Sequence, residues 1–175
     1  MEFDLTAFVT GNPLGNTAGL MDSDKTARNT AFFNACRQGF LAEAQSLLES
    51  GADLNTDRTG ITALLSAVVG RHRDVALWLL DSGAEANCHN EYGWSGLHEA
   101  IRQNDVELTR AFLDKGALIT RQPKRSGETP LMVACKQGNE EIGRMLLSKG
   151  ANAKALDNGR NTALHYAAAN GEAGL

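Results

Sequence analysis

One short motif occurs four times in this sequence of 175 residues, at a nearly constant spacing. Each copy begins with two large apolar residues and ends in Gly-Ala, and the copies start at residues 47, 79, 112 and 146. The steps between copies are therefore 32, 33 and 34 residues. A period of this length is typical of repeat proteins, in which each unit buries its apolar face against its neighbours.

A second motif lies 17 residues upstream of each copy of the first and occurs once more near the end of the chain. Its five copies begin with Thr or Ser and continue with small and apolar residues: Thr30–Phe33, Thr62–Leu65, Ser95–His98, Thr129–Met132 and Thr162–His165. A hydroxyl at this place is typical of a helix N-cap, because it accepts hydrogen bonds from free backbone N–H groups. The motif therefore predicts a helix start in all five units, Thr30 included.

Glycines predict where the helices end, because Gly adopts the left-handed conformation of a C-cap without strain. Gly39 and Gly138 are placed to end the first helix of a unit, and the Gly inside each copy of the first motif is placed to end the second helix. Arg71 and Asn104 occupy the first of these places in two other units. Since Arg tolerates the left-handed conformation poorly, we expect Gly70 to take over the cap beside Arg71.

Turn signals separate the units. Segments 57–60, 90–93, 125–127 and 157–159 each place a polar or charged residue shortly before a Gly. Such segments are typical of hairpin turns, because Asp and Asn bond the local backbone and Gly accepts a positive φ. The sequence thus predicts an all-α solenoid of helix–turn–helix units that are connected by β-hairpin loops.

These units resemble ankyrin repeats. The resemblance is carried by three stretches, namely Gly127–Leu131 with Ala134 and Gly138, Leu146–Leu147 with Gly150–Asn152, and Thr162–Ala168. It implies an ankyrin-repeat domain at 28–175, with units at 28–56, 57–89, 90–121 and 122–156 and an incomplete unit at 157–175. Residues 1–27 are then an N-terminal extension that is either flexible or packs as a cap.

The last unit breaks off at Leu175, where its second helix would begin. Because a repeat array needs a polar covering at its end, we expect the fourth unit to expose apolar side chains. The interpretation that we favour is a fragment of a longer protein. The alternative is that a partner, or a second copy of the chain in self-association through the incomplete C-terminal repeat, covers this edge.

Charge and composition exclude several classes of function. The chain has 17 Lys and Arg against 21 Asp and Glu, a net charge of −4 that argues against nucleic-acid binding. It contains no apolar run long enough to span a membrane, and its acidic start is unlike a signal peptide. Three cysteines without C-x-x-C spacing predict a reducing compartment. We expect a cytoplasmic protein, with the nucleus open for a eukaryotic source and secretion as an effector as an alternative.

Catalytic and metal-binding patterns are missing from the sequence. Ser95 lies between two glycines as in a nucleophile elbow, but the second glycine comes one position too early and Ser95 aligns with the helix caps. The four histidines lack metal-ligand spacing, and the ankyrin resemblance implies that His98 and His165 bridge neighbouring repeats. Cys88 falls in a loop and is expected to be the most reactive thiol. We therefore expect no enzyme, no cofactor and no metal.

The resemblance also implies where a partner would bind, namely at the hairpin tips and on the inner face of the first helices. The expected partner-binding residues are Arg58, Tyr92, Trp94 and Arg125 at the tips and Arg102, Gln103, Lys136 and Gln137 on the inner face. A basic residue followed by Gln recurs at the inner-face position, also as Arg37–Gln38, and Val69–Gly70 breaks this pattern. For Trp94 the alternative is packing on the neighbouring hairpin.

The predicted second helices are more acidic than the inner face. Segments 40–50, 73–82, 105–115 and 139–149 hold nine acids against five bases, so the basic residues concentrate on the other side. We therefore predict a non-catalytic scaffold for protein–protein interaction whose partner carries an acidic segment. Two alternatives remain open: a regulatory ankyrin segment of a larger enzyme or channel, and a dedicated inhibitor or effector that occludes an enzyme.

Overall fold

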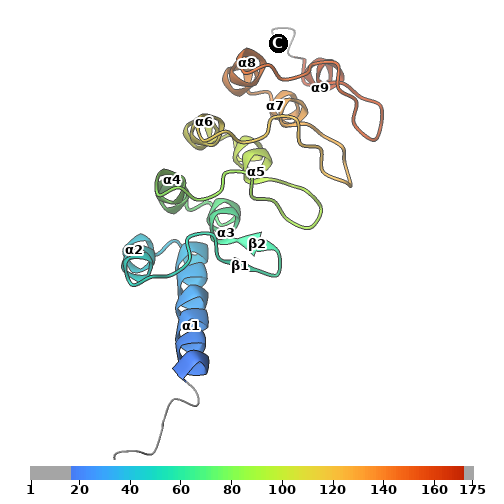
Figure 1. The fold of residues 1–175 in the computed structure, drawn as a ribbon. Coiled ribbons are helices and arrows are strands. Elements are labelled where there is room, and N and C mark those ends of the chain that lie inside the picture. Colours follow the sequence, from blue (N-terminus) through green and yellow to red (C-terminus); the bar gives the residue numbers. More distant parts are fainter. Residues whose placement is uncertain (1–16, 172–175) are drawn as a thin grey trace, which may run out of the picture.

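The computed structural model describes residues 17–171, with side chains from residue 23 onward. Four helix pairs and one further helix follow each other: α1 (Thr17–Gln38) with α2 (Leu41–Glu49), α3 (Ala63–Val69) with α4 (Arg73–Asp81), α5 (Gly96–Arg102) with α6 (Val106–Asp114), α7 (Pro130–Gln137) with α8 (Glu140–Ser148), and α9 (Ala163–Ala169). Figure 1 shows the pairs stacked in one direction, with the connecting loops projecting on one side and the second helices on the other. The predicted all-α repeat solenoid is confirmed.

Three first helices begin at the predicted hydroxyl caps. The side chains of Thr62, Ser95 and Thr129 each accept a hydrogen bond from the backbone N–H three residues further on, at 3.2–3.3 Å. The predicted helix start at Thr30 is wrong, because α1 runs without interruption from Thr17 to Gln38. No Gly or Pro stands between residues 20 and 37, so nothing in the sequence breaks the helix at Thr30.

The N-terminal boundary expected near residue 28 falls inside α1, which projects beyond the rest of the array (Figure 1). Residues 23–27 of this projecting part are exposed, whereas Phe32 and Cys36 near its other end are fully buried. The expected flexible or capping role of the extension concerns mainly residues 1–16, which lie outside the described residues.

The first helices end in left-handed residues, as predicted. Gly39 and Gly138 have φ of 81° and 68°. Arg71 itself adopts φ of 62°, while Gly70 is right-handed with φ of −71°, so the expectation that Gly70 shifts the cap is wrong. Gly70 is needed for space instead, because a Cβ there would lie 2.7 Å from the His72 ring.

The first loop is a β-hairpin of two short strands. Strand β1 (Asp57–Arg58) pairs antiparallel with β2 (Ile61–Thr62), and Thr59 and Gly60 between them both have positive φ, as a type I′ turn requires. The second loop keeps a single bridge, between His89 and Ser95. Within residues 17–171 the third and fourth loops form turns without strands.

The apolar core runs along the stack and opens at its last described helix. Leu64, Leu97 and Leu131 hold equivalent places in α3, α5 and α7 and are at most 2% exposed. Leu164, at the same place in α9, is 67% exposed. The difference arises because each first helix is covered by the next unit, and the described residues hold no further unit after α9.

Side-chain amides connect successive units. Asn55 and Asn87 each accept a hydrogen bond at their Oδ1 from a backbone N–H of the following unit, at 2.9 and 2.8 Å. Asn29 accepts one in the same way from Asp53 within the first unit, at 2.9 Å. Thr120 stands at the next equivalent place, so the series does not continue with the same side chain. These bonds fix the spacing of the first units and of the loops between them.

Candidate functional site

A groove of about 660 Å³ opens where the first two units meet their loops, and we call it the Trp94 groove. Helix α1 contributes Phe33, Asn34 and Arg37, and α3 contributes Leu65, Ser66, Val69 and Gly70. The β1–β2 hairpin contributes Arg58, Thr59 and Ile61, and the following loop contributes Asn90 and Trp94. The groove therefore has two helices on one side and two loops on the other.

The floor of the Trp94 groove is apolar. Phe33 and Leu65 lie beneath it as part of the buried core, and Ile61 is half-buried. Val69 at the end of α3 is 58% exposed, so the groove floor presents an apolar side chain to the solvent. Val69 is the residue that interrupts the basic–Gln pattern of the inner face, so this interruption creates an apolar place between Arg37 and Arg102 in the series.

Trp94 forms one wall of the groove and is held firmly in place. Its Nε1 donates a hydrogen bond to Oε2 of Glu99 at 3.2 Å, and its backbone N–H donates to Oδ1 of Asn90 at 3.0 Å. The ring lies 5.0 Å from the ring of His98 and packs against the buried core. These contacts of Trp94 are to residues of its own unit and not to the neighbouring hairpin of the alternative, and Trp94 also lines the groove.

Glu99 is a buried carboxylate on α5 that connects several predicted site residues. It accepts hydrogen bonds from Trp94, from Arg102 at 2.5 and 2.9 Å, and from Gln103 at 2.8 Å. Burial by itself would raise the pKa of Glu99, but the hydrogen bonds from Arg102, Gln103 and Trp94 outweigh it and lower the pKa below its ordinary value. The ionised carboxylate neutralises Arg102, and Gln103 in addition donates to the backbone carbonyl of Val68 at 2.7 Å.

Lys136 on α7 is paired in the same way. Its Nζ lies 2.8 Å from Oε1 of Glu128, which is 7% exposed, and 5.7 Å from the centre of the Tyr166 ring. Gln137 beside it is exposed. Two members of the expected basic row, Arg102 and Lys136, are therefore matched by buried acids of the same chain.

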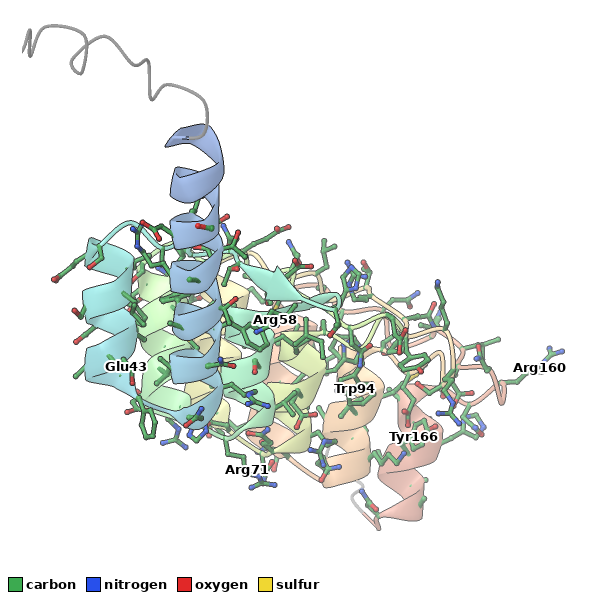
Figure 2. All side chains as sticks on the ribbon, turned by 90° about the horizontal axis from the view of Figure 1, so that it is seen from below. Glu43, Arg58, Arg71, Trp94, Arg160 and Tyr166 are labelled. Atoms are coloured by element: carbon green, nitrogen blue, oxygen red, sulfur yellow. The ribbon has the colours of Figure 1, made fainter. Side chains whose placement is uncertain are left out.

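Arg37 and Arg58 differ from these paired bases. Both are exposed, both line the Trp94 groove, and neither forms an ion pair with any residue that the structure describes. Figure 2 shows Arg58 and Trp94 along the side of the array that carries the loops. None of the groove's lining residues is acidic, so the groove combines an apolar floor with two unpaired guanidinium groups.

The two remaining tip residues lie outside the groove. Tyr92 is 49% exposed, and a hydrogen bond with the Glu91 side chain raises the pKa of its phenol. Arg125 is exposed, and its backbone carbonyl accepts a hydrogen bond from Nδ2 of Asn158 at 3.1 Å. The structure thus brings Arg58 and Trp94 together and leaves Tyr92 and Arg125 on separate tips.

Sequence reasoning missed Phe33, Leu65 and Val69 as groove residues. Phe33 and Leu65 are ordinary core residues by pattern, and only the packing of two units shows that they lie beneath a groove. The break of the basic–Gln pattern at Val69 was the one available signal.

The expected reactivity of Cys88 is wrong. Cys88 is 5% exposed, and burial raises the pKa of its thiol to about 11. Its loop folds back over α5, so that a Cβ at Gly96 would lie 3.0 Å from the Cys88 sulfur. A loop position in the sequence therefore does not mean an accessible thiol here.

The two histidines of the helix starts behave differently. Nε2 of His98 lies 3.1 Å from the backbone carbonyl of Glu128 in the next unit, so the expected bridge is confirmed there. His165 is exposed and contacts Thr162 of its own unit, with Nδ1 at 2.8 Å from the hydroxyl oxygen. The expected bridge from His165 is not formed, because no further unit follows it in the described residues.

Residues 17–171 contain no group of three or more His, Cys, Asp and Glu side chains close enough to hold a metal ion. None of their helices is long and apolar enough to cross a membrane.

A second groove, of about 350 Å³, lies between α7, α8 and α9 at the other end of the array. Leu164 and Leu147 line it and are 67% and 40% exposed. The residue equivalent to Leu147 in α4, Leu80, is fully buried. This end therefore exposes apolar side chains, as expected for the edge of the fourth unit.

Comparison with known proteins agrees with this architecture. The pattern of ankyrin repeats in three copies matches residues 11–90, 78–157 and 97–174. Human ankyrin repeat and SOCS box protein 16 is 30% identical over 192 aligned positions, which cover 86% of this chain and 42% of that protein. Human neurogenic locus notch homolog protein 2 is 30% identical over 158 positions, covering 89% of this chain and 6% of that protein. Zebrafish (Danio rerio) neurogenic locus notch homolog protein 1 is 34% identical over 121 positions, which cover 68% of this chain and 5% of that protein.

The chain thus spans less than half the length of each of these relatives. The repeat pattern, by contrast, covers nearly all of this chain, and its period agrees with the helix pairs and left-handed caps of the structure. The chain belongs to the ankyrin-repeat family.

Proposed function

We propose that this chain is a non-catalytic interaction module that binds a partner protein through the inner face of its first helices and its hairpin tips. Ankyrin repeats generally bind other proteins, and the observation that carries the proposal is the Trp94 groove. Its walls are helices and a hairpin that pack into one core, so the groove is formed before binding. A preformed surface loses little conformational entropy when a partner docks.

The composition of the groove supports this function. Interfaces derive most of their binding energy from a few residues, with Trp and Arg prominent among them, and burial of apolar area contributes about 25 cal/mol per Å². Trp94, Arg37 and Arg58 surround the exposed Val69. We infer that these residues form the centre of the interface, and that Arg102, Gln103, Lys136 and Gln137 extend it along α5 and α7 while Tyr92 and Arg125 contribute at the tips.

A matched pair of charge substitutions tests the location of the site. Peptides are first selected from a displayed random library on the immobilised wild-type chain, and their dissociation constants are then measured by fluorescence anisotropy. Val69→Glu places a charge on the groove floor and is expected to weaken binding at least about tenfold. Gln45→Glu, at an exposed place on α2, is the control and is expected to bind like the wild type. Equal loss or no loss in both variants would place the site elsewhere.

A second proposal concerns the protein as a whole. The relatives named above are far longer than the matched region, which favours a role of this array as the targeting or regulatory segment of a larger protein. The coding sequence around this chain in the source genome tests the proposal directly. A stop codon right after Leu175 together with a start codon at Met1 would contradict it.

Self-association through the C-terminal groove is a further proposal about partners. It is supported by the exposure of Leu164 and Leu147. Sedimentation equilibrium over a wide range of protein concentration tests it, with Leu164→Glu as the comparison. A concentration-dependent dimer that this substitution abolishes is the expected result, and a monomer at all concentrations contradicts it.

We also propose a reducing compartment, the cytoplasm or nucleus. Cys36, Cys88 and Cys135 are all buried and none forms a disulfide, and burial raises the pKa of Cys36 to about 12. Because no disulfide joins these cysteines, the fold does not depend on an oxidising environment.

A further inference from the structure

We propose that the Trp94 groove binds an extended peptide segment in which an acidic side chain accompanies a bulky apolar one, and that Arg37 and Arg58 select the acid. This inference rests on the proposed function and names the chemistry of the partner. The acidic preference is located in the first two units rather than along the whole inner face.

The charges of the groove are the first step. Arg37 comes from α1 and Arg58 from β1, so the two guanidinium groups reach the groove from different elements. Neither is ion-paired within the described residues, and no carboxylate lines the groove. A carboxylate that binds here meets donors that are free, and Arg binds carboxylates with strong, charge-assisted hydrogen bonds.

The paired bases further along the array give the contrast. Arg102 and Lys136 contact Glu99 and Glu128, which are 4% and 7% exposed. An incoming carboxylate would compete with an acid that is already fixed in place, and separating the pair would leave a buried charge without its partner. Arg102 and Lys136 therefore contribute little selectivity for an acidic partner, although they occupy the same position in their repeats as Arg37.

The apolar floor supplies the second part of the recognition. Val69 is exposed between the walls, with Leu65 beneath it and Trp94 beside it. An apolar side chain of the partner that covers Val69 removes this surface from water. Adjacent helices lie about 10 Å apart and an extended chain rises about 3.3 Å per residue, so the acid over Arg37 and the apolar residue over Val69 are about three positions apart.

Peptide selection tests this inference through the sequences that it returns. Short random peptides displayed on phage are selected on the chain of residues 1–175, and the enriched peptides are synthesised with a fluorescent label. The inference expects an Asp or Glu about three positions from a large apolar residue in the enriched set. Binding is then measured for wild type, for the double variant Arg37→Glu with Arg58→Glu, and for the control Lys154→Glu with Arg160→Glu. The control changes net charge equally at exposed bases outside the Trp94 groove.

The expected result is a loss of at least about tenfold in the groove double variant and little change in the control. The affinity of the wild type should also fall as salt is raised, and that of the groove variant should not, because screening acts on the Arg–carboxylate attraction. Circular dichroism and urea unfolding are the controls that check whether both double variants are folded.

Two other outcomes overturn the inference and separate it from the proposed function. Peptides that lose binding in Val69→Glu but carry no acid, or that bind the groove double variant as well as the wild type, contradict the acidic selectivity and leave the interaction module intact. If the peptides bind Val69→Glu as tightly as the wild type, or if the selection enriches no peptide over the uncoated support, both the acidic selectivity and the proposed interaction module are contradicted.

Discussion

Nε2 of His98 lies 3.1 Å from the backbone carbonyl oxygen of Glu128, and this contact joins α5 to the start of α7 in the next unit. On the other side of the ring, Nδ1 lies 2.7 Å from the hydroxyl oxygen of Ser95. The Ser95 oxygen also accepts the backbone N–H of His98, so its own hydrogen is free to be donated to Nδ1. Nε2 then carries the proton and donates to Glu128, which assigns the neutral tautomer.

The neutral His98 makes stability depend on pH. The side chain is fully buried, and burial lowers its pKa from 6.5 to about 4. Between these values the unfolded chain binds a proton at His98 that the folded chain does not, so acid favours unfolding. The contribution is complete above pH 6.5, and up to about 3 kcal/mol is lost as the pH falls to 4.

Urea unfolding at several pH values measures this dependence. In His98→Gln the titrating group is absent, so the free energy of unfolding should be lower at pH 7 and should fall less steeply between pH 6.5 and 4. His89→Gln, at an exposed place in the preceding loop, should keep the wild-type slope. An unchanged slope in His98→Gln would show that other groups cause the acid sensitivity.

Replacing Arg71 by Gly should stabilise the protein. Arg71 has φ of 62°, and the left-handed conformation costs an ordinary residue about 1–2 kcal/mol, of which Gly recovers a part after its own loss of entropy. We expect the free energy of unfolding to rise by about 0.5–1 kcal/mol. Arg71→Ala is the matched control, since it removes the same side chain but keeps the Cβ. A gain of equal size with Ala would mean that the charge of Arg71, and not its backbone, was unfavourable.

Replacing Asn55 should lower the free energy of unfolding more than its exposed position indicates. Its Oδ1 accepts the backbone N–H of Glu85 at 2.9 Å and so joins two units. Asn55→Ala removes this acceptor and should lower the free energy of unfolding by about 1 kcal/mol, while Asn55→Asp keeps an acceptor and should lose less. Asn152→Ala is the comparison, because the Oδ1 of Asn152 accepts its hydrogen bond from Lys154 within its own loop. Equal losses for Asn55→Ala and Asn152→Ala, measured by urea unfolding, would contradict a role in coupling the units.

Equivalent leucines inside the core and at its open end should respond very differently to truncation. Leu131 is 2% exposed, so Leu131→Ala creates a cavity and should cost about 2–5 kcal/mol. Leu164 is 67% exposed, and Leu164→Ala should stay within about 0.5 kcal/mol. Amide hydrogen exchange should likewise be faster over 155–171 than over 60–115, because a repeat gains stability from each neighbour. A loss at Leu164 as large as that at Leu131 would mean that another molecule covers this face in solution.

The candidate site was predictable only in part. The repeat alignment predicted Arg58 and Trp94 at hairpin tips, but only the structure shows that both line one groove. Arg102 and Lys136 were assigned the same role as Arg37 by the same alignment, but Glu99 and Glu128 pair with them in the structure. Glu99 and Arg102 are three residues apart on one helix, a spacing that favours pairing, whereas the pairing of Glu128 with Lys136 depends on how the loop before α7 folds back on that helix.

The sequence by itself determined the repeat period, the helix starts at Thr62, Ser95 and Thr129, and the left-handed caps. These features follow from bonds within a few residues, so local chemistry is sufficient to specify them. Only the tertiary structure decided that Cys88 is buried and that Val69 is exposed on a groove floor. Each of these depends on how one unit packs on the next, and identical local patterns lead to different surroundings according to which neighbours cover them.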